Sequence, residues 1–182
     1  MNNKITIASL LEVIKNLDYI KRNNINLISI RDTTPSEYYN NLYKMIDEAG
    51  IKNVFVAYFD DIVAPLPNRN EIVPNKEEIK KIIDWTKNIM GSNSNDIIVH
   101  CTGGVSRSSA VAILIKYMQN PESALSVINP MLHSPNEKII EIGGDILGDS
   151  GLVDKTNKLL LDSDEDFKNN LSKNKKDNSS IF

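Results

Sequence analysis

The chain has 182 residues, one cysteine, two histidines and a formal net charge of −3. One cysteine excludes an internal disulfide, and so few thiol and imidazole groups exclude an ordinary closed zinc site. The charge balance predicts neither a nucleic-acid-binding nor a membrane-binding surface, and because no long apolar leader or spanning stretch is visible we expect a cytoplasmic protein.

Strand-like and helix-like patterns alternate along the chain. Ser9 and Glu12 predict a capping box at the start of the first helix. The alternation predicts an α/β fold with a central, mostly parallel sheet of four to five strands flanked by helices. Strands are expected at residues 5–7, 25–30, 54–59 and 97–99, and helices at 9–21, 34–50, 75–91, 109–118, 122–128 and 136–147.

The C-terminal end of the chain differs in composition from the rest. From residue 162 onward it consists mainly of Asp, Asn, Ser and Lys, with few apolar side chains to bury. Such a segment cannot offset the conformational entropy lost on folding. We therefore expect a catalytic domain over residues 1–161 and a disordered tail over residues 162–182.

The single cysteine lies in a short loop between a predicted buried strand and a predicted buried helix. The loop contains Gly103, Gly104 and, five residues after Cys101, an arginine, Arg107. A helix N-terminus attracts anions through its free N–H groups and dipole, and glycines allow the backbone to curl around a ligand. These features predict a loop that binds a phosphate dianion and presents a thiolate to its phosphorus.

Residues 100–108, HCTGGVSRS, match the pattern H-C-x-x-G-x-x-R-[ST]. They resemble the phosphate loop of the cysteine-dependent protein tyrosine phosphatases and their dual-specificity relatives. Phe59-Asp60-Asp61-Ile62 resembles the acid-bearing loop of this superfamily. Residues 134–148 resemble the C-terminal helix region of predicted bacterial tyrosine phosphatases, so that the similarity covers about residues 54–150.

The resemblance implies a role for each residue of the site. Cys101 would be the nucleophile that forms a cysteinyl-phosphate, Arg107 would hold two phosphate oxygens, and Ser108 would hydrogen-bond the departing thiolate. Asp61 is the implied general acid, with Asp60 in reserve and Asp32 next. His100 would order the loop, and Asn136 would either brace it or simply cap a helix. The implied substrate-binding residues are Thr102, Gly103, Gly104, Val105, Ser106 and Arg107.

The implied activity is that of a protein tyrosine or dual-specificity phosphatase that needs no metal or organic cofactor. Two other functions stay open: a module that binds phosphoprotein without turnover, and a phosphatase of inositol phosphates or RNA 5′-phosphates. The loop contains no lysine, unlike many phosphoinositide phosphatases of the superfamily. The sequence does not fix the oligomeric state.

Overall fold

The computed structural model describes residues 3–68, 70–92 and 96–178. Within these ranges, no helix has the length and apolar character needed to cross a membrane. The strands are β1 (Ile5–Ser9), β2 (Asn26–Arg31), β3 (Val54–Tyr58) and β4 (Ile97–Cys101), and the helices are α1 (Leu10–Lys15), α2 (Leu17–Arg22), α3 (Glu37–Glu48), α4 (Lys76–Ser92), α5 (Arg107–Gln119), the 3₁₀ helix η1 (Pro121–Val127), α6 (Glu137–Leu147) and α7 (Leu152–Asn178).

The four strands form one parallel sheet in the order β1-β4-β2-β3, as the alternating sequence pattern predicts. β4 lies between β1 and β2, with Ser9 opposite Cys101 and Ile28 opposite Val99. Because the strands are parallel, their carboxyl ends meet at one edge of the sheet. This edge brings together Cys101 and the residues that directly follow β2 and β3.

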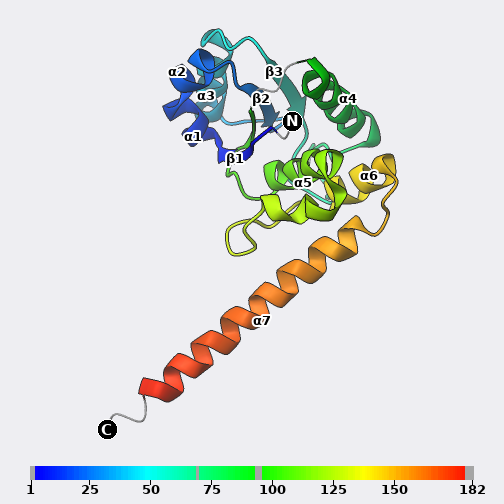
Figure 1. Cartoon of the computed structure of the whole chain (residues 1–182). Helices are drawn as coiled ribbons and strands as arrows, with labels where there is room; N and C mark the ends of the chain where they lie inside the picture. The colour runs from blue at the N-terminus through cyan, green and yellow to red at the C-terminus, as the bar shows by residue number, and fades with distance from the viewer. Residues whose placement is uncertain (1–2, 69, 93–95, 179–182) are drawn as a thin grey trace.

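Helices cover both faces of the sheet (Figure 1). One hydrophobic cluster joins α1, α2 and α3 to one face and includes Leu10, Ile20 and Ile46. A second, larger cluster joins α4, α5 and α6 to the other face. α5 is buried along most of its length, as its apolar sequence predicts. The C-terminal end of the loop that precedes it is therefore attached to a rigid helix.

Two predicted helices differ in detail from the structure. The capping box of Ser9 and Glu12 is present, but the helix predicted over residues 9–21 is broken at Asn16 into α1 and α2. The Asn16 amide donates to the Glu12 carbonyl oxygen, a local bond with which Asn side chains interrupt helices. The segment predicted as a helix at 122–128 is the 3₁₀ helix η1.

The structure gives residues 162–178 a helical form where the sequence predicts a disordered tail; residues 179–182 lie outside the described part. Leu152 and Thr156 are buried at the start of α7, but Leu161 and Phe167 are 65% and 49% exposed. Figure 1 shows α7 projecting from the body of the protein. Once a helix has been nucleated, here by the packed start of α7, each added residue forms one more backbone hydrogen bond, so a scarcity of apolar residues does not by itself prevent a helix.

We propose that residues 162–182 are dispensable for the fold. Their removal is expected to change the free energy of unfolding by no more than about 0.5 kcal/mol, because the described part of this segment is mostly exposed. Thermal or urea unfolding measures the change. A longer truncation that also removes Leu152 and Thr156 is the control, and it should be clearly destabilising. A large loss with the shorter truncation would show that Phe167 packs on the domain.

Candidate active site

The β4–α5 loop lies between two buried side chains that are chemically important. Cys101 is the last residue of β4 and Arg107 the first of α5, and both are buried, at 2% and 3% exposure. Residues 102–106 between them are half-buried or exposed. The predicted substrate-binding loop is therefore open to solvent above a buried thiol and a buried guanidinium.

Gly104 allows the loop to curl tightly against the end of β1. Its φ is +73°, a conformation that side chains disfavour. A Cβ atom at this position would lie 2.6 Å from the Ser9 backbone nitrogen and 2.8 Å from the Ala8 carbonyl carbon. Both constraints require glycine, which explains why the fixed glycine of the motif falls here.

The loop backbone presents donors suited to an anion. Among the described residues, none accepts a hydrogen bond from the N–H groups of residues 103–106. Ser106, at the N-cap of α5, also makes no side-chain capping bond, so the positive end of the helix dipole faces the loop. Free N–H groups around one concavity are the usual protein site for phosphate.

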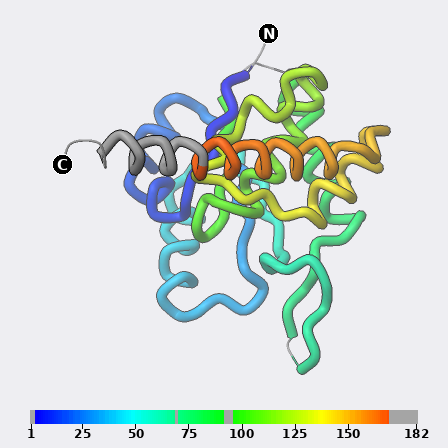
Figure 2. The backbone as a smooth tube through the Cα atoms, turned by 90° about the horizontal axis from the view of Figure 1, so that it is seen from below, coloured from blue at the N-terminus to red at the C-terminus, as the bar shows by residue number. Residues whose placement is uncertain are grey.

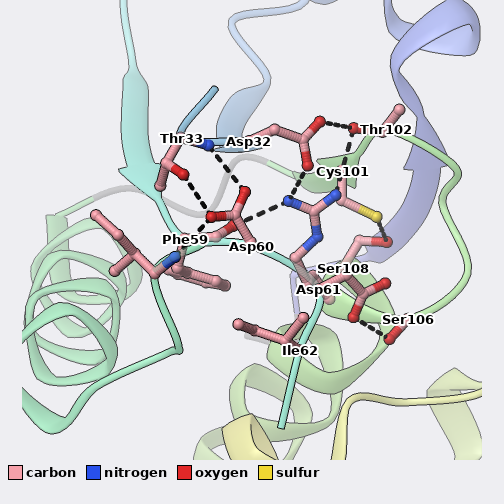
Figure 3. Close-up of polar contacts among 12 residues, drawn as sticks. Asp32, Thr33, Phe59, Asp60, Asp61, Ile62, Cys101, Thr102, Ser106 and Ser108 are labelled. Carbon is pink, nitrogen blue, oxygen red and sulfur yellow. Dashed lines mark hydrogen bonds and ion pairs between the residues drawn. The ribbon is translucent and has the colours of Figure 1, made fainter. Parts of the chain in front are cut away.

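The thiol of Cys101 lies against the first turn of α5. Its Sγ is 3.3 Å from the Ser108 Oγ, and Ser108 is fully buried (Figure 3). A hydroxyl at this distance can donate to a thiolate. The contact suits the role that the sequence assigns to Ser108, stabilisation of the sulfur as it leaves phosphorus.

Arg107 is held by three groups around the loop. Its Nη1 donates to the Phe59 carbonyl oxygen at 2.9 Å and pairs with the Asp32 Oδ1 at 2.8 Å. Its Nη2 donates to the Thr102 Oγ1 at 3.3 Å. The Nε–H has no partner among the described residues, although it is buried.

The two adjacent aspartates after β3 have different surroundings. Asp60 is buried and accepts hydrogen bonds from the Thr33 backbone N–H, the Thr33 hydroxyl and the Ile72 backbone N–H. Burial by itself would raise the pKa of Asp60, but the hydrogen bonds from Thr33 and Ile72 outweigh it and lower that pKa. Asp60 thus anchors the loop that follows β3, which extends outward from the body in Figure 2.

Asp61 instead faces the phosphate loop. It is exposed, and its Oδ1 accepts from the Ser106 Oγ at 2.7 Å and from the Asn136 Nδ2 at 2.9 Å. Asn136 caps α6, and its backbone N–H donates to the Ser106 carbonyl oxygen. This residue therefore both caps a helix and contacts the phosphate loop, the two alternatives that the sequence left open. Asp61 therefore forms hydrogen bonds to the loop, whereas the side-chain hydrogen bonds of Asp60 go to Thr33 and Ile72.

His100 is buried directly before Cys101 in the chain. Its Nδ1 is 3.4 Å from the Cys101 carbonyl oxygen. Burial, with smaller contributions from Arg31 and Arg107, lowers the pKa of His100 to about 4, so that the imidazole is neutral at pH 7. Its place under the loop fits a structural role.

The His100 imidazole is expected to make stability depend on pH. Its pKa is about 4 in the folded protein and ordinarily 6.5, so the unfolded chain binds the proton more readily and stability falls as pH drops from 6.5 toward 4. Between pH 7 and 4.5 the loss should be about 2 kcal/mol. Urea unfolding at both pH values measures it.

The matched control is His100→Gln, which should remove most of this pH dependence whatever it does to the absolute stability. The lowered pKa of Asp60 causes almost no loss of folding stability between pH 7 and pH 4.5. The stability that Asp60 contributes disappears only as pH falls below about 3.8. An equal slope in the wild type and in His100→Gln would contradict the assignment to His100.

The sequence did not predict the pairing of Asp32 with Arg107, nor the contact of Tyr43 with both ends of the loop. The Tyr43 hydroxyl donates to the Asp32 Oδ2 at 3.5 Å and lies 3.4 Å from the Thr102 Oγ1. The available signal was the position of Asp32 directly after a strand, at the same sheet edge as Cys101. Nothing in the local sequence of Tyr43 distinguishes it from other core residues of α3.

Comparison with known proteins supports the fold described above. No family model matches the chain. A tyrosine-protein phosphatase 1 from Schizosaccharomyces pombe is 30% identical over 67 residues, which are 36% of this chain and 12% of that protein's length. The structure of PTPMT1 in complex with PI(5)P superposes with a TM-score of 0.54 at 14% identity, over 86% of this chain and 94% of that one.

The human tyrosine phosphatase-like serine/threonine/tyrosine-interacting protein superposes with a TM-score of 0.53 at 17% identity, over 79% of this chain and 91% of that one. At these identities the superpositions establish the fold. They agree with the parallel sheet of this chain. The chain has the fold of the cysteine-dependent protein tyrosine and dual-specificity phosphatases.

Proposed function

We propose that this chain is a phosphomonoesterase that dephosphorylates protein side chains through a cysteinyl-phosphate intermediate. The observation that carries the proposal is the convergence of three groups on one anion-binding loop. The Cys101 thiol and the Arg107 guanidinium lie at its two ends, and Asp61, which must be protonated to act in the first step, is held to it by Ser106. These are a nucleophile, a phosphate ligand and a proton donor.

The proposed reaction has two steps. The Cys101 thiolate attacks phosphorus, the ester oxygen leaves, and Asp61 gives that oxygen its proton. The Asp61 carboxylate then takes a proton from a water molecule that attacks the phosphocysteine, the S–P bond breaks, and inorganic phosphate leaves. Ser108 donates to the thiolate as it departs, while Arg107 and the loop N–H groups hold the phosphoryl oxygens throughout.

A groove beside the loop supports a peptide substrate. It has a volume of about 500 Å³ and extends from Asp61 and Ser106 to Pro135. Val63 and Leu66, 55% and 44% exposed, give it apolar walls, and its described lining includes two carboxylates but neither lysine nor arginine. Such a surface suits an apolar residue that flanks a phosphorylated side chain, and it disfavours a headgroup with several phosphates.

The first test is hydrolysis of para-nitrophenyl phosphate by the full chain. Hydrolysis of this ester, together with a phosphate bound to cysteine that rapid acid quench traps, would support the proposed phosphatase activity. Absence of turnover together with retained phosphate affinity would instead identify a module that binds phosphoprotein.

Because a reactive thiol requires a reducing compartment, we propose that the protein is cytoplasmic.

The second test compares substrate classes at equal concentration. Peptides with phosphotyrosine, phosphoserine or phosphothreonine, soluble inositol phosphates, phosphoinositide vesicles and RNA with a 5′-phosphate form the panel. We expect the highest kcat/KM with phosphopeptides that carry an apolar residue next to the phosphorylated one. Preference for an inositol phosphate, a phosphoinositide or the RNA would contradict the protein substrate.

A further inference from the structure

The groove beside the phosphate loop adjoins a second hollow that lies against α6. Val63 and Glu137, which line the groove, also line this hollow, whose volume is about 250 Å³. Its other walls come from Glu141 on α6 and from Val153 at the start of α7. Glu137 therefore lies where the groove that leaves the phosphate loop meets the second hollow.

Glu137 is held in place at this junction. It is the first residue of α6 and follows Asn136, whose backbone N–H donates to the Ser106 carbonyl oxygen of the phosphate loop. The side-chain amide of Asn157, on α7, donates to the Glu137 Oε1 at 3.1 Å. The described residues give the other oxygen, Oε2, no partner, and Glu137 is exposed. One carboxylate oxygen is thus fixed, and the other is free to accept a hydrogen bond from a ligand.

The negative charge of Glu137 is not balanced by its surroundings. Among the described residues that line the groove and the hollow, the one cation is Lys138, and its Nζ pairs with the Glu141 Oε2 at 2.8 Å. Asp61 must carry its proton to act in the first step, so it adds no negative charge at that moment. Glu137 is then an unpaired carboxylate beside a loop that binds a dianion. It repels phosphate, and a ligand that carries a cation next to its phosphate removes that penalty.

We propose that the hollow at Glu137 is a subsite for a basic side chain, lysine or arginine, close in sequence to the phosphorylated residue of the substrate. The proposal rests on the proposed function in that the ligand is a phosphopeptide, but it requires binding and not turnover. The apolar stem of the basic side chain would lie on Val63 and Val153, with its cationic head at the Glu137 Oε2. The dianion in the loop and the cation at Glu137 would together fix the direction in which a peptide lies.

The alternative is that Glu137 only joins α6 to α7 through its bond to Asn157. Glu137→Gln separates the two roles. The glutamine keeps a side-chain oxygen that can accept from the Asn157 amide, but it has no negative charge. A purely structural role survives this substitution, whereas attraction for a cation does not.

The test measures the affinity of synthetic phosphopeptides by fluorescence anisotropy, in a Cys101→Ser background so that nothing is hydrolysed. Each peptide has one phosphotyrosine or one phosphoserine in an alanine-rich sequence, with a single arginine placed in turn at each position before and after it. We expect arginine to strengthen binding by about 3- to 5-fold at a position on one side, the upper range for an exposed ion pair. Equal affinity of the arginine-containing and arginine-free peptides would overturn the proposal.

Two variants assign the effect to Glu137. Glu137→Gln should remove the advantage that arginine gives, and Glu137→Lys should transfer it to a peptide with glutamate at the same position. The matched control is Glu48→Gln, which removes the same charge from an exposed residue of α3, on the other face of the sheet, and should leave the advantage unchanged. An advantage that survives Glu137→Gln would contradict the subsite.

Salt and peptide position separate a defined subsite from general attraction. Added salt should reduce the arginine advantage, because the pair is exposed and screened. An equal advantage at every position would show attraction to the net negative charge of the chain and would overturn the subsite.

The outcome also separates the subsite from the proposed function. If the wild type hydrolyses no ester but the arginine preference is found, the phosphatase proposal fails and the subsite stands. If phosphopeptides are hydrolysed and bound equally well with and without arginine, the phosphatase proposal stands and the subsite fails. Absence of any phosphopeptide binding would overturn the subsite together with the protein substrate.

Discussion

Cys101→Ser is expected to fold normally, to lose hydrolysis of para-nitrophenyl phosphate by up to about 10⁶-fold, and to keep its affinity for phosphate. Serine is nearly the same size as cysteine, and its hydroxyl can take the place of the thiol beside the Ser108 Oγ. A serine alkoxide does not form near neutral pH without a strong base. His100, next to it in the chain, is buried and not placed to act as one.

Arg107→Lys is the complementary control, because it leaves the thiol in place and removes the planar fork. It should weaken phosphate binding as well as turnover, whereas Cys101→Ser weakens turnover alone. Unfolding curves for both variants show whether the fold is intact. Activity of Cys101→Ser close to that of the wild type would place the chemistry at another group.

Asp61→Asn is expected to lower turnover by about 10²–10⁴-fold, the contribution of a general acid. The loss should be largest for esters with poor leaving groups, and small for those that depart without a proton. The basic limb of the pH–rate profile should flatten, because that limb reports loss of the acid's proton. Steady-state rates for a series of aryl phosphates, measured over a range of pH, test both expectations.

Asp60→Asn is the matched control for Asp61, one residue away in the chain. It weakens the anchor formed with Thr33 and Ile72, so it should reduce stability and affect all esters to a similar extent. If the leaving-group dependence follows Asp60 instead, the two roles are exchanged. If neither substitution matters, the proton comes from elsewhere and the acid loop was misidentified.

The strands and the phosphate loop could be predicted because their signals are local. β3 is an apolar run that is buried or partly buried up to Tyr58, and β2 is buried along its whole length, as expected for strands of a parallel sheet. The loop has five fixed positions within nine residues, and Gly104 is required there by its contact with β1. Asp61 followed from its position after β3 together with the family resemblance.

The remainder of the site depends on contacts between distant segments. The pairing of Asp32 with Arg107 joins the end of β2 to the start of α5, and it exists only because β4 lies next to β2 in the sheet. No local sequence pattern predicts that β4 lies next to β2. The break at Asn16 and the helical form of residues 162–178 depend on small free-energy differences, which composition does not resolve.

The central position of β4 has a consequence for how the chain folds during its synthesis. Within the described residues β1, the first strand made, pairs only with β4, and Ile5 meets Ile97 there after most of the sheet has been made. Until then only β2 and β3 can pair, and the edge of β2 stays open. Pairings between such distant segments form slowly, so we expect a lag between the synthesis of the chain and the appearance of a competent thiol. Among the described strands, the last one made carries Cys101, the proposed nucleophile, and closes the sheet.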